Sequence, residues 1–294
     1  MSSLFICNTS SDYISQINLA EFYEERRIPL GVDKISRIGP QGICAYKDKL
    51  LVANSYNNSL SILDMAQMMQ IEEYFIGMHC NGVEVSEDNA YVVCGELNSI
   101  IIFNLTKKKI IEEIPCGSFP YSISIDKTKG FIAVANMHSD SITLIDCRNK
   151  ENILNIRSSN YPTKAVFDES SQFILVAESN MGIKSNGTLS IIELNGLKRV
   201  GKIKVGNSPV DIFTEKNYCY VSNLGDGTIS IVDIKNLKEI KRIKTGGMPR
   251  AIIKHEEYIY VSDSYNDIIL QLNLKNGNKK VISVGKEPTA MTIY

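Results

Sequence analysis

The sequence contains no tryptophan, only three histidines, and no cysteine pair with Cys-x-x-Cys spacing. The absence of tryptophan excludes repeat classes whose signature includes that residue. The seven cysteines are scattered and odd in number, which is typical of a reducing cytoplasm and not of a disulfide framework. Gly-x-Ser-x-Gly, a phosphate-binding glycine-rich loop and metal-spaced Cys/His sets are all missing. The sequence therefore predicts no cofactor and no metal, and it leaves enzymatic activity uncertain, leaning towards none.

No charge of one sign dominates: 32 Lys and Arg face 33 Asp and Glu, for a net charge of −1. This balance disfavours a nucleic-acid partner gripped across a broad basic face, although a local basic patch stays open. No span approaches the roughly 20 apolar residues of a membrane helix. The opening MSSLFICNTSSDY also lacks a basic segment followed by a long apolar run. We expect a cytoplasmic protein that does not bind membranes.

The chain is instead built from a repeat. Seven times a short apolar strand ends in a small polar or acidic residue, and usually ten residues later a second apolar strand ends in Asp, Asn or Glu. We call the residue that ends the first strand of each pair a repeat mark. Successive repeat marks are 46, 41, 41, 42, 45 and 40 residues apart; they are Asn8, Asn54, Gly95, Asn136, Glu178, Asn223 and Asp263. A period near 40 with several strands per unit predicts a β-propeller. Because the repeat is unbroken, we predict a single domain over residues 1–294.

The segment 216–249 gives the clearest unit. Residues 218–223 (YCYVSN) and 227–233 (GTISIVD) form two apolar strands, and 238–245 (KEIKRIKT) alternates charge with Ile, as an outer edge strand facing water does. A Gly-x-x-Pro turn then leads into the innermost strand of the next blade, and we expect its glycine to permit the tight turn. The same turn recurs as Gly117 with Pro120, Gly206 with Pro209, Gly246 with Pro249 and Gly285 with Pro288.

These units resemble the YVTN family of seven-bladed propellers, and the Tyr220-Val221-Ser222-Asn223 segment is close to the tetrapeptide that names it. NHL-type propellers are a near neighbour in pattern, whereas WD40 and kelch repeats fit poorly without tryptophan. The resemblance covers essentially the whole chain. It implies an all-β fold, a seven-bladed β-propeller of four-stranded antiparallel blades. Since residues 287–294 (EPTAMTIY) match an innermost strand, the C-terminal strand should join the N-terminal blade and close the ring.

Two insertions interrupt the repeat. Residues 179–187 (SNMGIKSNG) lengthen one loop, and residues 32–37 (VDKISR) lengthen the connection between the first two blades. Loops of these two kinds should emerge on one face, so we hypothesise that the insertions stand on opposite sides of the channel mouth and flank a bound ligand or partner. Drift of tolerated surface loops is the alternative.

Residues that follow each turn into an innermost strand should ring that mouth. Lys164, Asp211 and Arg250 are its charged members, Tyr121 is an aromatic one, and we predict that all four bind ligand. An internal ion-pair network centred on Asp211 is the competing interpretation. Asn8, Asn54, Asn136 and Asn223 are interpreted as turn residues that hydrogen-bond their own loops.

Carboxylates replace or adjoin the amide at three of the repeat marks. These are Glu178, Asp263 and Glu96, and with Asp211 they offer oxygen ligands of the kind that Ca²⁺ prefers. His138 lies in a loop on the same face. We include Glu178, Asp263, Glu96 and His138 among the predicted ligand-binding residues.

The leading hypothesis is a non-catalytic binding propeller that presents a polar face to an unknown protein partner or small molecule. Oligomeric state is left open. One alternative is a lactonase- or lyase-like enzyme that uses Glu178, His138 and Arg250 over the channel. Another is a single-stranded nucleic-acid binder with tyrosine platforms beside a cationic groove. Its residues would be Tyr56, Tyr121, Tyr161 and Tyr265 with Lys34, Arg37, Lys164 and Arg250.

Overall fold

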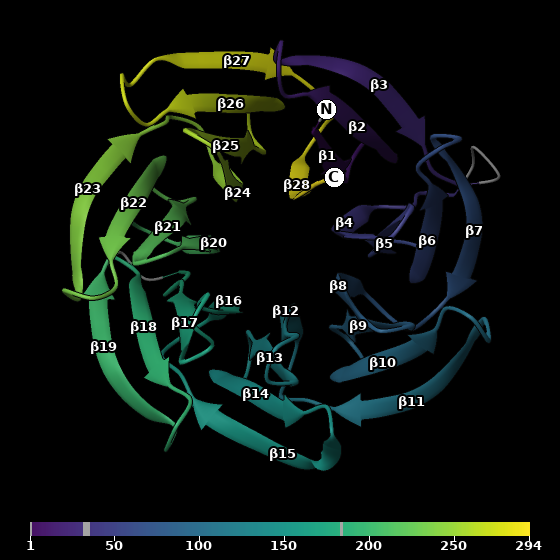
Figure 1. Ribbon diagram of the computed structural model, residues 1–294, viewed down its shortest axis with the longest axis horizontal. Helices are drawn as coiled ribbons and strands as arrows, with labels where there is room; N and C mark the ends of the chain where they lie inside the picture. The colour runs from purple at the N-terminus through teal and green to yellow at the C-terminus, as the bar shows by residue number, and fades with distance from the viewer. Residues whose placement is uncertain (1, 32–35, 183–184) are drawn as a thin grey trace. The chain divides into compact units, whose positions relative to one another are not determined.

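A computed structural model describes residues 2–31, 36–182 and 185–294. The described residues form seven four-stranded antiparallel sheets, which are the blades of a seven-bladed β-propeller (Figure 1). The predicted fold class is confirmed. Blades are numbered here from the N-terminus. The innermost strand of each blade is called its first strand. Within the described residues no helix is long and apolar enough to cross a membrane.

Packing divides the chain into two compact units, described separately. Unit 1 comprises Met1–Leu97, Ile101–Glu113 and Ile253–Tyr294, and unit 2 comprises Asn98–Ile100 and Ile114–Ile252. The blades that lie in unit 1 wholly or largely are blades 1, 2, 3 and 7. Blade 1 pairs β28 (Pro288–Ile293), β1 (Ser3–Asn8), β2 (Tyr13–Asn18) and β3 (Tyr23–Pro29); blade 2 pairs β4 (Pro40–Tyr46), β5 (Lys49–Asn54), β6 (Ser59–Asp64) and β7 (Met69–Phe75). Blade 3 pairs β8 (Cys80–Ser86), β9 (Asn89–Cys94), β10 (Ser99–Asn104) and β11 (Lys109–Pro115); blade 7 pairs β24 (Pro249–His255), β25 (Tyr258–Asp263), β26 (Ile268–Asn273) and β27 (Lys279–Ser283).

Unit 2 holds blades 4, 5 and 6 together with the beginning of β24. Blade 4 pairs β12 (Pro120–Asp126), β13 (Phe131–Asn136), β14 (Ser141–Asp146) and β15 (Asn149–Arg157); blade 5 pairs β16 (Pro162–Phe167), β17 (Phe173–Glu178), β18 (Thr188–Glu193) and β19 (Lys198–Lys204). Blade 6 pairs β20 (Pro209–Glu215), β21 (Tyr218–Asn223), β22 (Thr228–Asp233) and β23 (Lys238–Lys244).

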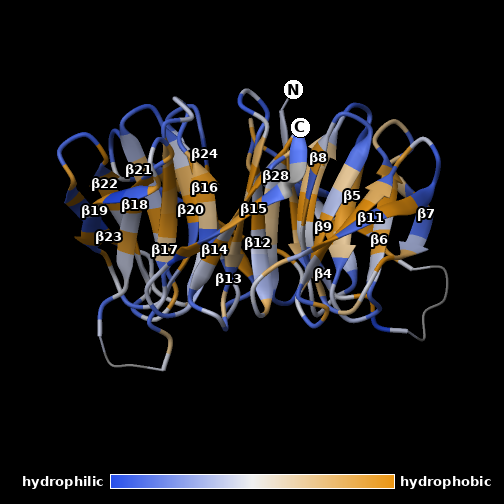
Figure 2. Cartoon of the chain, turned by 90° about the horizontal axis from the view of Figure 1, so that it is seen from below, coloured by the Kyte–Doolittle hydropathy of each residue, from blue (hydrophilic) through white to orange (hydrophobic). Residues whose placement is uncertain are grey.

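The second and third strands of each blade are buried on both faces. Every residue of β21 after Tyr218 is buried, because its side chains alternate between the two faces of the sheet and both faces are covered. One core cluster of unit 2 joins blades 5 and 6 through residues such as Leu189 and Val221. The fourth strand β23 is mostly exposed, as its alternating charges predicted. Figure 2 shows the resulting pattern, with apolar residues along the strands and mostly hydrophilic loops.

The C-terminal strand completes the N-terminal blade, as predicted. β28 pairs antiparallel with β1, and the backbones of Ser3 and Tyr294 exchange two hydrogen bonds of 2.9 and 3.0 Å. The hydroxyls of Thr9 and Thr289 lie 2.8 Å apart, and Thr9 Oγ1 also donates to the Pro40 carbonyl at 2.6 Å. The first blade is therefore assembled from both ends of the sequence and tied to the second.

The asparagines at the repeat marks close their own turns and also join two strands. In three blades Nδ2 donates to the hydroxyl just past the loop, over 2.9 Å from Asn54 to Ser59, 3.1 Å from Asn136 to Ser141 and 3.1 Å from Asn223 to Thr228. Each asparagine is fully buried at the end of its strand, and its Nδ2 donates to a hydroxyl seven residues later in the next strand. The distances are 2.8 Å from Asn8 to Ser15, 2.8 Å from Asn54 to Ser61, 2.8 Å from Asn136 to Thr143 and 2.9 Å from Asn223 to Ser230. The recurring amide thus joins two strands of one blade.

This asparagine also explains the glycine of the Gly-x-x-Pro turn. A Cβ on Gly206 would lie 2.5 Å from Asn223 Cγ, and one on Gly285 would lie 2.6 Å from Asn8 Cγ. Neither glycine has a positive φ; the left-handed residue is instead the one before proline, with φ of 50° at Ser208 and 55° at Glu287. The glycine is required for close approach, and the predicted conformational reason holds only for Gly246, whose φ is 80°.

Blade 3 contains a pair of neighbouring thiols. Cys80 and Cys94 are direct partners across β8 and β9, and their Sγ atoms lie 3.8 Å apart. Both side chains are fully buried. Cys94 thus stands where blades 1, 2, 4 and 6 carry the buried asparagine, one residue before the predicted repeat mark Gly95, and its sulfur packs against that of Cys80.

Candidate functional site

Unit 2 gathers four of the predicted residues on first strands. Tyr121 lies on β12, Lys164 on β16, Asp211 on β20 and Arg250 on β24. In β12, β16 and β20 the pairing register shifts directly after the initial proline. Such a bulge bends the strand and redirects side chains. The bulge after the first proline of β12, β16 and β20 therefore sets the direction of the side chains at the start of these strands.

Contacts connect the four residues in pairs. Lys164 Nζ lies 3.1 Å from Asp211 Oδ1, and Asp211 Oδ2 accepts a 3.0 Å hydrogen bond from the backbone N–H of Ile252. Arg250 Nη2 lies 3.0 Å from the Tyr121 hydroxyl, which joins blade 7 to blade 4 within unit 2. The Arg250 carbonyl accepts from Ser222 Oγ at 2.6 Å. The pair of Lys164 with Asp211 is one arm of the ion-pair network that the sequence offered as the interpretation competing with ligand binding.

Two cations, Lys164 and Arg250, and the carboxylate of Asp211 thus lie on first strands of unit 2. The side chains of Lys164 and Asp211 are 29% and 18% exposed, so both are accessible while their partners hold them in place. Fixed, partly desolvated donors bind anionic groups more strongly than freely rotating surface lysines do. We call these four residues the inner-strand cluster.

Glu178 lies elsewhere in unit 2 and is completely buried at the end of β17. Its carboxylate accepts hydrogen bonds from Thr188 Oγ1 at 2.6 Å, the Ser159 backbone N–H at 2.9 Å and Ser158 Oγ at 3.1 Å. Arg199 Nη2 lies 3.4 Å and Lys202 Nζ 3.6 Å from it. These partners enclose the carboxylate.

The pKa of Glu178 reflects opposing causes. Burial alone would raise it, because desolvation disfavours the carboxylate. Hydrogen bonds from Thr188 and Ser159, with the positive charge of Lys202, outweigh burial and hold the pKa below its ordinary value. The lowered pKa keeps the Glu178 carboxylate ionised at neutral pH.

His138 forms part of an aromatic group in unit 2. Its ring stacks on Phe119 with centroids 4.5 Å apart and meets the edge of Tyr161 at 6.2 Å. The three residues proposed for an enzyme thus have separate partners: Glu178 its hydroxyls and cations, His138 its aromatic rings, and Arg250 the Tyr121 hydroxyl.

The remaining predicted site residues, Glu96 and Asp263, belong to unit 1. Glu96 is exposed. Asp263 is buried and accepts from the backbone N–H groups of Tyr265 and Asn266, both at 3.1 Å, so it caps its own turn. Across residues 2–31, 36–182 and 185–294, no three His, Cys, Asp or Glu side chains are grouped closely enough to hold a metal ion. The structure does not support the Ca²⁺ hypothesis in this part of the chain.

The residues considered for nucleic-acid binding are only partly engaged with one another. In unit 1 the Arg37 guanidinium lies over the Tyr56 ring at 5.6 Å and pairs with Asp12 at 2.6 Å. Tyr265 is 72% exposed. Lys34 lies outside the described residues. The charge of Arg37, the cation that lies over Tyr56, is therefore balanced by the Asp12 carboxylate.

The loop that follows β17 contacts the connection that leads into β16. In blade 5, the backbone N–H groups of Ser179 and Asn180 donate to the carbonyls of Tyr161 and Asn160, which precede β16. The loop 179–187 is confirmed as longer than its counterparts by the bounds of β17 and β18. Residues 32–35 and 183–184, at the centre of the two insertions, lie outside the described residues.

Sequence reasoning missed the partners of Glu178. Ser158 and Ser159 stand where other blades carry an apolar residue and glycine, as Val205 and Gly206 do before blade 6. The change from Asn to Glu at the repeat mark coincides with this change from Gly to Ser. A position-by-position comparison of the blades would therefore have pointed to Ser158 and Ser159.

The fold and these contacts define the chain as a seven-bladed β-propeller with polar groups on its first strands. No protein-family model matches the sequence, and no curated protein matches it. Among solved structures it is similar to hydrazine synthase of Kuenenia stuttgartiensis, with a TM-score of 0.77, 17% identity, and coverage of 96% of this chain and 92% of that one. It is also similar to dihydro-heme d1 dehydrogenase NirN in complex with DHE, with a TM-score of 0.71, 14% identity, and coverage of 96% and 64%. At these identities the likeness is one of fold alone.

Proposed function

We propose that the protein is a non-catalytic binding module that holds an anionic small molecule or an acidic segment of a partner protein at the inner-strand cluster. The observation that carries the proposal is the positioning of Lys164 and Arg250 by Asp211 and the Tyr121 hydroxyl. Preorganised cations lose little freedom on binding, so more of the interaction energy appears as affinity. Membership of the YVTN group and a cytoplasmic location belong to the same proposal and rest on the sequence pattern.

The test compares the unmodified chain with a Lys164→Gln/Arg250→Gln double variant. Each protein is recovered from a lysate of its source and examined by native mass spectrometry for retained small molecules and proteins. The control is Arg148→Gln/Lys241→Gln, which removes the same two charges from the exposed surface of unit 2. Glu178 is left intact, because its burial makes any substitution a test of folding as well.

We expect an anionic species to remain with the unmodified chain and the control and to be lost from the double variant. Retention by all three proteins, or by none, would remove support for the cluster as the binding site. Single-stranded oligonucleotides are included in a fluorescence titration at two salt concentrations. Tight binding that weakens steeply with salt would instead favour the nucleic-acid alternative.

A further inference from the structure

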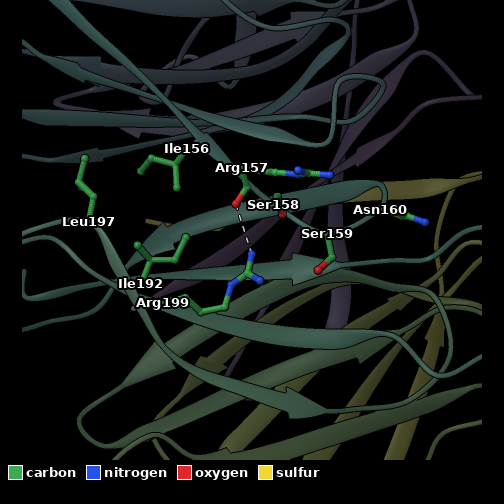
Figure 3. A pocket seen from close by; sticks show the side chains of 8 residues that line it. All are labelled: Ile156, Arg157, Ser158, Ser159, Asn160, Ile192, Leu197 and Arg199. Atoms are coloured by element: carbon green, nitrogen blue, oxygen red, sulfur yellow. Dashed lines mark hydrogen bonds between the residues drawn. The ribbon is translucent and has the colours of Figure 1, made fainter.

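A cavity of about 450 Å³ lies beside Glu178, between the outer parts of blades 4 and 5 in unit 2. It is separate in composition from the inner-strand cluster and shares none of its residues. Its lining consists of Ile156, Arg157, Ser158, Ser159, Asn160, Ile192, Leu197 and Arg199. Figure 3 shows the three apolar side chains gathered towards one end and Arg157, Ser159 and Asn160 towards the other, with Arg199 beside them. The cavity thus has an apolar end and a cationic end.

The cationic end keeps unused hydrogen-bond donors. Arg157 is exposed, and its guanidinium has no protein partner among the side chains that the structure describes. Within the described part of the chain, Arg199 donates through Nη2, weakly, to the Arg157 carbonyl at 3.3 Å and to Glu178 at 3.4 Å. Its side chain is 36% exposed. Guanidinium groups with free N–H groups are suited to two-pronged binding of carboxylate and phosphoryl oxygens.

The charge balance also favours an anion here. Arg157, Arg199 and Lys202 supply three positive charges, and among the described residues Glu178 is the carboxylate that pairs with Arg199 and Lys202. Lys202 Nζ lies 2.5 Å from Ser159 Oγ, which fixes both groups at the polar end. The buried carboxylate of Glu178 therefore orients Arg199 and Lys202, while the net charge of these groups together with Arg157 stays positive on the solvent side.

This junction is built differently from its counterparts. The segment before blade 5 reads Ser158-Ser159, whereas the segment before blade 4 reads Cys116-Gly117. In the latter the glycine packs against an uncharged asparagine, since a Cβ on Gly117 would lie 2.8 Å from Asn136 Cγ. The ordinary repeat thus needs neither the buried carboxylate nor the cations around it.

We propose that this cavity binds a small molecule that carries one oxyanion, a carboxylate or a phosphoryl group, at the end of a short apolar chain. Arg157 and Arg199 hold the oxyanion, while Ile156, Ile192 and Leu197 cover the chain. The volume falls within the range of about 300 to 1,000 Å³ that is usual for ligand pockets. The proposal does not depend on the function assigned to the inner-strand cluster.

Isothermal titration calorimetry with hexanoate, hexyl phosphate and 1-hexanol tests it on the full chain. We expect at least one anion to bind and the alcohol to bind at least roughly tenfold more weakly, because a charged hydrogen bond is lost. The tighter of the two anions identifies the head group. Equal binding of the alcohol, or no binding of either anion at millimolar concentration, would overturn the proposal.

Variants at the two ends locate the site. Arg157→Gln should weaken anion binding roughly tenfold without disturbing the fold, since that guanidinium holds no described partner. Arg148→Gln is the matched control. Leu197→Asn removes the apolar contact at a residue whose φ is 51°, a conformation that asparagine tolerates. It should weaken hexanoate binding; because Leu197 also packs against a core cluster of blades 4 and 5, its thermal unfolding is measured in parallel, and affinity is compared only at temperatures where the variant is folded. Equal affinities for Arg157→Gln and Arg148→Gln would contradict the assignment.

Discussion

At the scale of single residues, a buried amide with a glycine packed against it recurs in several blades. Asn223 fills the space above Gly206 and donates to Ser230 in the next strand. Glu178 keeps the position but changes its chemistry, because a carboxylate requires donors that the ordinary turn lacks. The two kinds of blade therefore respond differently to mutation.

Replacing Glu178 with Ala should destabilise the protein by about 3 kcal/mol, because Arg199 and Lys202 lose the carboxylate between them and Thr188 loses its acceptor. Glu178→Gln should cost less, since the amide oxygen still accepts. Urea denaturation at pH 7 measures both free energies of unfolding. A loss below about 0.5 kcal/mol for the alanine variant, which is typical of exposed positions, would contradict the described network.

The same residue predicts a pH dependence. The pKa of Glu178 is lowered in the folded state, so its stabilising contribution is fully present above the unfolded value of 4.5. That contribution is lost as pH falls from 4.5 through the lower folded pKa. The difference in stability between the unmodified chain and Glu178→Gln should therefore be constant from neutral pH down to the unfolded value and should shrink below it. Denaturation series across this range in both proteins measure the effect.

Gly206→Ala should destabilise by about 1 to 3 kcal/mol, the usual cost of overpacking, because the new Cβ would lie 2.5 Å from Asn223 Cγ. The control is a cycle that combines it with Asn223→Ala. Since the smaller side chain removes the clash, the double variant should be more stable than the sum of the single effects implies. Strict additivity in guanidinium denaturation would show that the contact is not the reason for the glycine.

At the scale of elements, the closure of blade 1 by β28 has a direct test. Removal of residues 287–294 deletes β28, its ladder with β1 and the Thr9–Thr289 contact. We expect the truncated chain to lose the cooperative thermal transition and to expose the backbone of β1, which hydrogen exchange would detect. A soluble truncated protein that melts cooperatively near the original temperature would count against this view. Loss of residues 1–2 alone provides a length control.

The sequence predicted these elements well for a physical reason. Period-two alternation, the polar residue that ends each strand and the proline that begins the next blade are local features, and seven repetitions reinforce them. The pairing of Lys164 with Asp211 could also be inferred from the repeat, because equivalent positions on adjacent blades are neighbours. The partners of Glu178 did not follow, since Ser158, Arg199 and Lys202 lie on different strands and their side-chain directions depend on packing. The bond from Arg250 to Tyr121 likewise joins blades that are not adjacent in sequence.

At the scale of the whole molecule, we predict a single unfolding transition. Strand β11 contains residues of both compact units, as does β24. Unfolding of either unit would therefore remove residues from a sheet of the other. Scanning calorimetry should give equal calorimetric and van't Hoff enthalpies. Two resolved transitions would instead show that the units unfold separately, contrary to the single-domain prediction.

The contact between Cys80 and Cys94 means that the oxidation state of this cysteine pair should report the redox environment in which the protein folded. Two buried thiols that face each other across a strand pair need little movement to form a disulfide once an oxidant reaches them. Burial shields them from brief exposure, so only molecules that fold or dwell in an oxidising compartment would acquire the bond. Protein alkylated at the moment of cell lysis and analysed by peptide mass spectrometry should carry both thiols reduced if it lives in the cytoplasm, whereas a Cys80–Cys94 crosslink would place it outside.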